Sequence, residues 1–262
     1  TRHVAVGESV EHSVVLISTD DGETWDSAVL SDKVLHVTDI VWTGDSYFVT
    51  TETSVTPIFF SFDARNWVTV GAATTTFDKL PWDNEGWDNS PLSCPSNLLN
   101  VGTHYNGKHI AAGEAIVVSD DGVHWNSVFN FGSNLVNRIY SIAYVEINTF
   151  NGYIAIGSGN EVTQFGNTGF PVFTEVARVV TSVNGNDWQL LTPNFTNNGM
   201  TTLVNSDEII VVAGNNGEVW YSYNAAIWTT ARSERRCEPN PFAPTVRLVL
   251  SLVRRKVRAS YS

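Results

Sequence analysis

Cysteine, methionine and positive charge are all scarce in this sequence of 262 residues. Its two cysteines, Cys94 and Cys237, are too few for a disulfide framework or a structural zinc site, and a single long-range disulfide between them is left open. No apolar run reaches the roughly 18 residues that a membrane-spanning helix needs. With 42% hydrophobic and 11% aromatic residues, the composition is that of a globular protein. We therefore expect no membrane insertion.

The few positive charges are unevenly distributed along the chain. Residues 1–231 carry seven basic and 25 acidic residues, a net charge of −18, whereas eight of the 15 Lys and Arg residues lie after residue 231. A surface this acidic repels the phosphates of nucleic acids and anionic lipids, so we expect no nucleic-acid partner for it. Residues 232–262 are interpreted as a basic C-terminal extension, either solvated or in contact with polyanions.

One short pattern recurs five times and organises the sequence. It consists of a hydroxyl residue, any residue, Asp or Asn, Gly or Ala, two further residues and Trp, and each copy follows an apolar, β-prone run. The Asp or Asn can accept backbone N–H groups of a tight turn, Gly adopts positive φ there, and Trp packs beneath the turn. We call this predicted device a turn lock, centred on Asp21 and Trp25, Asp63 and Trp67, Asp121 and Trp125, Asn184 and Trp188, and Asn224 and Trp228.

The spacing of the tryptophans is that of a repeat architecture. Successive turn-lock tryptophans are 42, 58, 63 and 40 residues apart, which indicates a unit of about 40 residues with two long insertions. Within the units, turn dipeptides such as Asn-Gly separate short β-prone runs, four to a unit. Four antiparallel strands, repeated radially, form the blade of a β-propeller. The sequence therefore predicts an all-β chain in which residues 1–231 form a five-bladed β-propeller of four-stranded antiparallel blades.

The first unit lacks its own first strand, because the chain reaches the second strand almost immediately, at Val4. The run 245–252 near the C-terminus is β-prone and is a candidate for the missing, ring-closing strand. The other readings are that residues 232–262 are unrelated to the ring, or that the chain is part of a larger ring or closes with another chain.

The five copies resemble Asp-box (BNR) repeats, which occur in sialidases and in many other β-propellers. The first copy is the best match, while two copies replace Gly by Ala and two replace Asp by Asn. The resemblance covers roughly residues 3–231 and implies a propeller. It implies no activity, because Asp boxes in that family lie on outer turns away from the catalytic centre. The repeats are also similar to those of exported bacterial proteins and phage structural or tail-associated proteins, which implies an extracellular or virion setting.

Both insertions are predicted to lie on one face of the propeller, which is the usual ligand face in such folds. The first, residues 77–97, sets two Trp among acidic residues, a mixture that stacks on sugar rings and accepts their hydroxyls or coordinates Ca²⁺. Its spacing is not that of an EF-hand, so no metal is assigned. The second, residues 158–177, is aromatic and suits a pocket cap or a subunit contact. Alternatively, each loop only packs on its own blade. The candidate ligand-binding residues are Trp82, Asp83, Glu85, Trp87, Asp88, Phe165 and Phe170.

Catalysis has little support in the residue pattern. A sialidase needs an arginine cluster that residues 1–231 do not supply. A propeller glycoside hydrolase with inner-strand carboxylates is the alternative, with Asp39 and Glu114 as its candidates. The histidines show no close-spaced metal pattern. The sequence thus favours a non-enzymatic protein, without a cofactor, that binds a glycan or a protein surface, alone or in a larger assembly.

Overall fold

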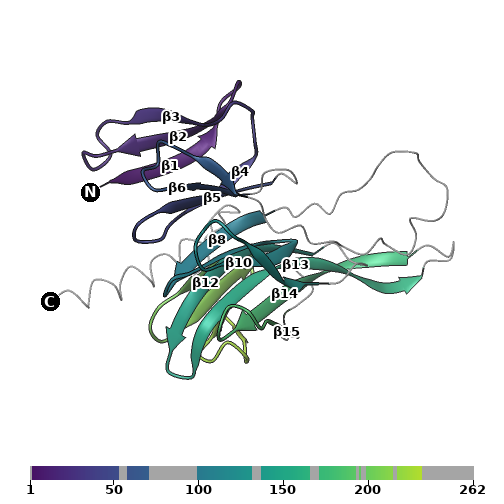
Figure 1. Cartoon of the computed structure of the whole chain (residues 1–262). Coiled ribbons are helices and arrows are strands. Elements are labelled where there is room, and N and C mark those ends of the chain that lie inside the picture. Colours follow the sequence, from purple (N-terminus) through teal and green to yellow (C-terminus); the bar gives the residue numbers. More distant parts are fainter. Residues whose placement is uncertain are drawn as a thin grey trace, which may run out of the picture. The chain divides into compact units, whose positions relative to one another are not determined.

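All regular elements of the described chain are β-strands, arranged in five antiparallel sheets (Figure 1). In each sheet the strands follow one another in chain order. The chain divides into two compact units, residues 1–138 and 139–262. Within the described part, no helix is long and apolar enough to cross a membrane. The computed structural model describes residues 2–52, 58–70, 99–131, 137–165, 171–192, 195, 199–214 and 217–231.

The first unit holds three sheets. The first sheet has three strands, β1 (His3–Glu8), β2 (Ser13–Ser18) and β3 (Asp26–Ser31). The second has four strands, β4 (Val37–Trp42), β5 (Tyr47–Thr51), β6 (Ile58–Ser61) and β7 (Val68–Val70). The third also has four, β8 (Leu99–Tyr105), β9 (Lys108–Gly113), β10 (Ala115–Ser119) and β11 (Asn126–Asn130).

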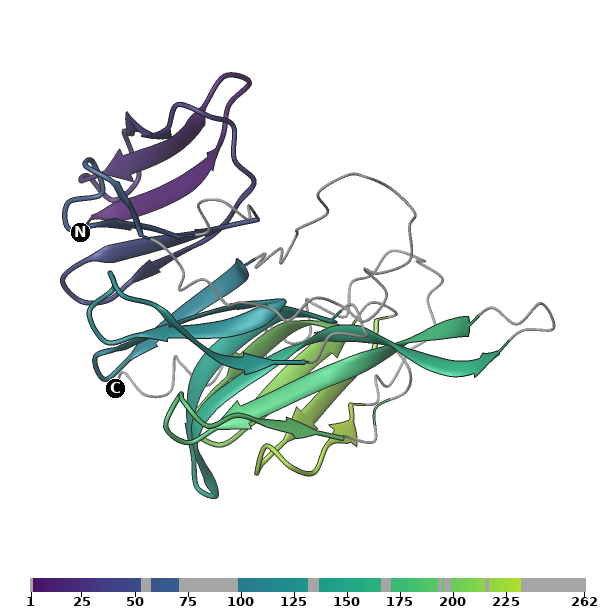
Figure 2. The same cartoon turned by 45° about the vertical axis from the view of Figure 1, so that its right-hand side comes forward.

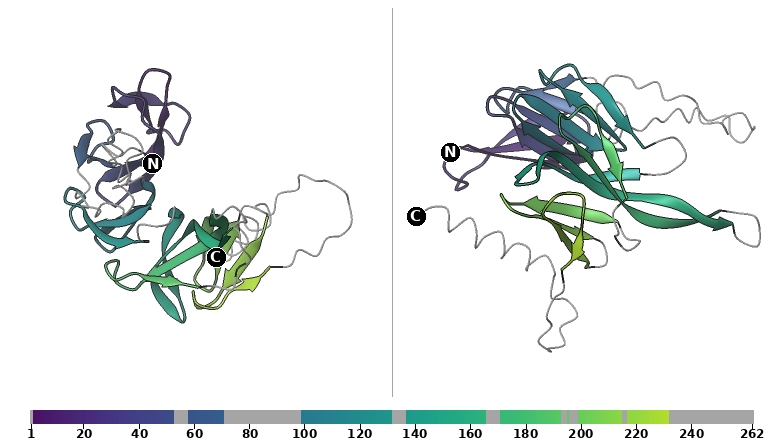
Figure 3. Two further views of the ribbon diagram at one scale, coloured as in Figure 1. Left: turned by 90° about the vertical axis from the view of Figure 1, so that its right-hand side faces the viewer. Right: turned by 90° about the horizontal axis from the view of Figure 1, so that it is seen from below.

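The second unit is built around two four-stranded sheets, drawn in green and yellow-green (Figure 3). One consists of β12 (Asn137–Ile147), β13 (Phe150–Phe165), β14 (Pro171–Ser182) and β15 (Gln189–Leu191). The other consists of β16 (Met200–Asn205), β17 (Ile210–Gly214), β18 (Val219–Ser222) and β19 (Thr229–Thr230).

The middle strands of the second and third sheets are buried on both faces, which explains their unbroken apolar runs. All residues of β10 and all but the first of β9 are buried. Face-to-face packing of neighbouring sheets causes this, since Phe48 and Ile58 of the second sheet share a core with Val117 and Trp125 of the third. A strand covered on both sides has no solvent face, so period-two alternation is lost.

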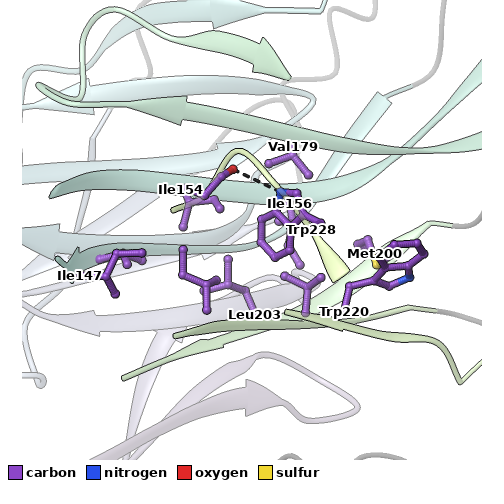
Figure 4. Packing of buried hydrophobic residues seen from close by; sticks show 12 residues of the cluster. Ile147, Ile154, Ile156, Val179, Met200, Leu203, Trp220 and Trp228 are labelled. Atoms are coloured by element: carbon purple, nitrogen blue, oxygen red, sulfur yellow. Dashed lines mark hydrogen bonds between the residues drawn. The ribbon is translucent and has the colours of Figure 1, made fainter. Parts of the chain in front are cut away.

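The core of the second unit follows the same plan (Figure 4). Ile154, Ile156 and Val179 of one sheet pack against residues of the other, including Leu203 and Trp228, and most of these side chains are fully buried. Each sheet therefore supplies one wall of a core shared with its neighbour.

The predicted all-β architecture of antiparallel four-stranded units is confirmed, and the described residues of the first repeat unit form three strands. Among the described residues no strand pairs with the free edge of β1, so the first sheet has three strands. The segment predicted to supply the fourth strand, 245–252, lies outside the described residues, as does the whole extension 232–262.

The prediction of a long irregular loop at 158–177 is wrong. β13 and β14 continue through most of it as a paired hairpin, from Ser158 opposite Ala177 to Phe165 opposite Pro171. Figure 2 shows this green hairpin extending past the other strands of its sheet. The β-branched and aromatic residues of both arms favour an extended backbone, which explains why strand pairing continues.

Candidate functional site

Four of the five turn locks share one hydrogen-bond pattern. The Asp or Asn Oδ1 accepts the backbone N–H groups two and three residues further on, at 2.7 to 3.1 Å. The indole Nε1–H donates to the carbonyl three residues back, at 2.8 to 3.2 Å. The residue after the Asp or Asn has positive φ. The residues in these roles are Asp63 and Trp67, Asp121 and Trp125, Asn184 and Trp188, and Asn224 and Trp228.

The first turn lock differs from its prediction, because Asp20 and not Asp21 accepts the turn amides. Asp20 Oδ1 accepts the Thr24 N–H at 2.9 Å and the Ser18 hydroxyl at 2.7 Å. Asp21 is an extra residue with positive φ, and its carboxylate lies 3.4 Å from His3 Nε2. The Thr24 hydroxyl, which donates to the Asp20 carboxylate, is the main reason that the pKa of Asp20 falls to about 2.

The extra residue also changes the environment of the first tryptophan. Trp25 still donates to the Gly22 carbonyl at 3.0 Å, but it is 44% exposed, whereas Trp125 and Trp228 are each 2% exposed. The longer first turn lock thus keeps the hydrogen bond from Trp25 to the Gly22 carbonyl, but it leaves the indole half-exposed to solvent.

Asp39, the candidate catalytic carboxylate, is bound by backbone amides. Its Oδ1 accepts the Ile40 N–H at 2.8 Å, and its Oδ2 accepts the Gly102 N–H of β8, in the next sheet, at 2.9 Å. Burial raises the pKa of Asp39, and the two amides act in the opposite direction. In the second unit, the Ser141 hydroxyl of β12 accepts the Leu203 N–H of β16 in the same way, at 3.3 Å. Asp39 therefore links the inner strands of two neighbouring sheets.

The other predicted site residues are placed as follows. Glu114 lies between β9 and β10 and is partly buried. Phe165 ends β13, and its side chain is outside the description. In the part of the chain that the structure describes, no three His, Cys, Asp or Glu side chains gather as metal ligands. The remaining candidates lie outside the described residues: Trp82, Asp83, Glu85, Trp87, Asp88 and Phe170, as do Cys94 and Cys237.

A pocket of about 650 Å³ lies beside β1, the strand with a free edge. One wall comes from β1 and the residue before it, and the other comes from β4 and β5 of the second sheet. In the remaining sheets an inner strand precedes the strand equivalent to β1. The pocket thus adjoins the edge of β1 that has no pairing strand among the described residues. Its lining residues are Arg2, His3, Val4, Ile40, Trp42 and Tyr47.

The pocket combines an exposed aromatic surface with a cation. Trp42 is 51% exposed and packs on the buried ring of Tyr47, with the ring centroids 4.4 Å apart. Among the residues that the structure describes, the Arg2 guanidinium donates one long hydrogen bond, 3.4 Å, to the Asp63 carbonyl. At the other end of β1, the Glu8 carboxylate accepts the Val37 N–H at 2.9 Å and ties β1 to β4.

The pocket lies beside the tight turn between β4 and β5, which its aromatic residues Trp42 and Tyr47 flank. The sequence analysis did not select Trp42, although one signal was present. Trp42 is a tryptophan outside the turn-lock spacing, at the end of a strand next to the unit with the missing strand.

The five antiparallel sheets define this chain as a β-propeller of five blades, the first of them three-stranded in the described residues. Neither a protein-family model nor a curated protein sequence matches it. The structure is similar to YCF48 from Cyanidioschyzon merolae, with a TM-score of 0.52 and 14% sequence identity over 87% of this chain. The chain spans 66% of the length of that structure.

Two further solved structures are similar at lower scores. YCF48 bound to D1 peptide has a TM-score of 0.40 and 16% identity, covering 88% of this chain and 77% of that one. An α-L-arabinofuranosidase, Arb93A from Fusarium graminearum in complex with an iminosugar inhibitor, has a TM-score of 0.48 and 13% identity, covering 93% of this chain and 79% of that one. Likeness at these identities concerns the fold and carries no activity to this chain.

Proposed function

We propose that this propeller is a non-enzymatic recognition protein that binds an extended segment of a partner protein along the free edge of β1. The observation that carries the proposal is the pocket of about 650 Å³ beside an edge strand without a pairing partner among the described residues. An exported or virion setting remains part of the proposal, and the acidic surface of residues 1–231 suits an exposed, soluble molecule.

The backbone of β1 supplies the affinity in this proposal. In an antiparallel pair every second residue directs its N–H and C=O away from its partner, so the free edge of β1 offers a row of donors and acceptors. An extended peptide satisfies these groups by adding a strand to the sheet. Since β1 runs from His3 to Glu8, it has room for a segment of similar length.

The side chains of the pocket supply the selectivity. Trp42 and Tyr47 offer an apolar, aromatic wall beside Val4 and Ile40, which suits an aliphatic or aromatic side chain of the bound segment. The Arg2 guanidinium, which makes one long hydrogen bond within the described part of the chain, suits a carboxylate or a backbone carbonyl.

Two alternatives to peptide binding are a glycan ligand and a hydrolase activity. The exposed Trp42 indole also suits the apolar face of a sugar ring, so a glycan is the other ligand to test. The hydrolase alternative has Asp39 and Glu114 as its candidates, and the two amides bound to the Asp39 carboxylate give that residue a structural explanation.

Substitution of Trp42 tests the proposal. We expect a displayed library of extended peptides, panned against the full chain, to yield binders whose affinity falls at least tenfold in Trp42→Ala, because a contact worth about 1.4 kcal/mol or more is lost. The matched control is Tyr223→Ala, which removes an aromatic side chain of similar exposure, 59%, from the turn between β18 and β19. Binding is measured by calorimetry on both variants and the parent chain.

Hydrogen exchange of the β1 amides gives the decisive second measurement. Outward amides of β1 should exchange fast in the free chain and become protected with a selected peptide. If they are already protected, a segment of this chain, such as 245–252, or a second copy covers the edge, and the proposal is wrong. Peptides that bind Trp42→Ala unchanged contradict it too. Binding on a glycan array, lost in Trp42→Ala while no peptide is selected, assigns the pocket to a sugar instead.

A further inference from the structure

Two histidines face each other across the hairpin of β8 and β9. His104 and His109 are direct partners in the strand register, next to the tight turn at Asn106 and Gly107, both of which have positive φ. In a hairpin with a two-residue turn, the residues that flank the turn form a hydrogen-bonded pair, and the next pair, here His104 and His109, is non-hydrogen-bonded. The side chains of a non-hydrogen-bonded pair lie close together. The Nδ1 atoms lie 3.2 Å apart, and the ring centroids lie 4.6 Å apart.

The surroundings of this pair are apolar on one side and acidic on the other. His109 is 6% exposed and contacts the rings of Phe48 and Trp125. Burial is the main cause that lowers the pKa of both imidazoles. The negative charge of Asp45, on the turn between β4 and β5, has the opposite effect and raises both pKa values. Two more carboxylates, those of Asp120 and Asp121, interact electrostatically with His109, and Lys108 pairs with Asp120 at 3.0 Å.

The geometry of this hydrogen-bonded pair also suits two ligands of one metal ion. Zinc–nitrogen bonds of about 2.0–2.1 Å at a tetrahedral angle place two ligand nitrogens about 3.3–3.4 Å apart, close to the 3.2 Å between the two Nδ1 atoms. Metal ligands must be unprotonated, and burial, which lowers the pKa of both imidazoles, favours their neutral form. The nearby carboxylates make the electrostatic environment favourable for a cation.

We propose that His104 and His109 bind a divalent transition-metal ion of the zinc class through their Nδ1 atoms, with water completing the coordination. In the metal-free pair, one ring donates its Nδ1–H to the other. Binding moves that proton to Nε2 of the same ring, so no net proton release is needed at neutral pH. Imidazole nitrogen is a preferred ligand of zinc, copper and nickel. The bound ion would join β8 and β9 and rigidify their hairpin.

A zinc titration of the full chain, stripped with EDTA, tests the site. We expect calorimetry with zinc chloride to show saturable binding that His104→Gln and His109→Gln each weaken strongly, and zinc to raise the melting temperature of the parent chain but not of these variants. Gln keeps a polar group able to bond to the remaining imidazole, so the variants should fold. The matched control is His12→Gln, in the loop between β1 and β2, which should bind zinc as the parent does.

A spectrum of the unmodified chain keeps the test independent of how the variants fold. In a long-range ¹H–¹⁵N correlation of the imidazoles, zinc should shift the Nδ1 signals of His104 and His109 and leave both rings in the Nε2–H form. No saturable binding, or binding that both Gln variants retain, overturns the proposal. Unchanged signals of the two rings in the presence of zinc overturn it as well and leave the pair as a hydrogen bond.

Discussion

Trp125→Ala is expected to lower the free energy of unfolding by about 3–5 kcal/mol, because it empties a closely packed site in the core. The indole is 2% exposed, contacts the rings of Phe48 and His109, and donates to the Gly122 carbonyl at 2.9 Å. Substitution therefore leaves a cavity between two sheets and removes the hydrogen bond that closes the turn. Denaturant unfolding, followed by tryptophan fluorescence and far-UV circular dichroism, measures the change.

Trp25→Ala is the matched control, since it removes the same residue from the equivalent place in the first turn lock. Trp25 is 44% exposed and keeps the same hydrogen bond, so we expect a loss of only about 1 kcal/mol. Equal losses in the two variants would contradict this account, because burial of the indole, and not its hydrogen bond, is what distinguishes them.

Asp39→Leu is expected to cost about 2–4 kcal/mol of stability, because two backbone N–H groups in a largely buried site lose their acceptor. Those donors belong to Ile40 and Gly102, and the second of them lies in the neighbouring sheet. Asp39→Asn keeps one carbonyl oxygen and should cost about 1–2 kcal/mol. Chemical denaturation of both variants beside the parent chain gives these values.

The same two variants separate the structural role of Asp39 from a catalytic one. We expect neither the parent chain nor Asp39→Asn to hydrolyse a panel of aryl glycosides, while both Asp39 variants lose stability. Turnover by the parent that Asp39→Asn abolishes, with an unchanged unfolding midpoint, would restore the hydrolase alternative and remove the structural one.

The repeat, the strands and the turn locks could be predicted from sequence because they depend on residues close together in the chain. For example, the β-prone run from Val37 to Trp42 forms β4 over its whole length. The first turn lock was predicted one residue out of register, since Asp20 and Asp21 are adjacent and each lies two residues after a hydroxyl residue. Which of the two carboxylates accepts the turn hydrogen bonds depends on where the backbone places the Ser18 hydroxyl, which donates to Asp20. Composition does not encode this detail of backbone geometry.

The candidate pocket could not be predicted from the sequence, and the reason is physical. Its walls come from β1 and from Trp42 and Tyr47, which belong to different sheets, so their meeting depends on how the sheets pack. The absence of one strand from the first unit was visible, but a missing strand does not say which side chains line the space. Asp39 shows the opposite difficulty, because it was selected as a candidate site residue. The sequence places this carboxylate on an inner strand, but it does not say whether the carboxylate binds a substrate or a backbone amide.

The turn locks of the two units differ in whether their acceptor side chains ionise. In the first unit their acceptors are the carboxylates of Asp20, Asp63 and Asp121, whose pKa values are all lowered by hydrogen bonds within the turn, to about 2 for Asp20. Such a group stabilises the folded state above its unfolded pKa, near 3.9, and stops doing so as the pH falls through its folded value. In the second unit the acceptors are the amides of Asn184 and Asn224, which do not titrate. As the pH falls below about 4, the stabilisation by the carboxylate turn locks of the first unit is therefore lost progressively, whereas the amide turn locks of the second unit keep their contribution.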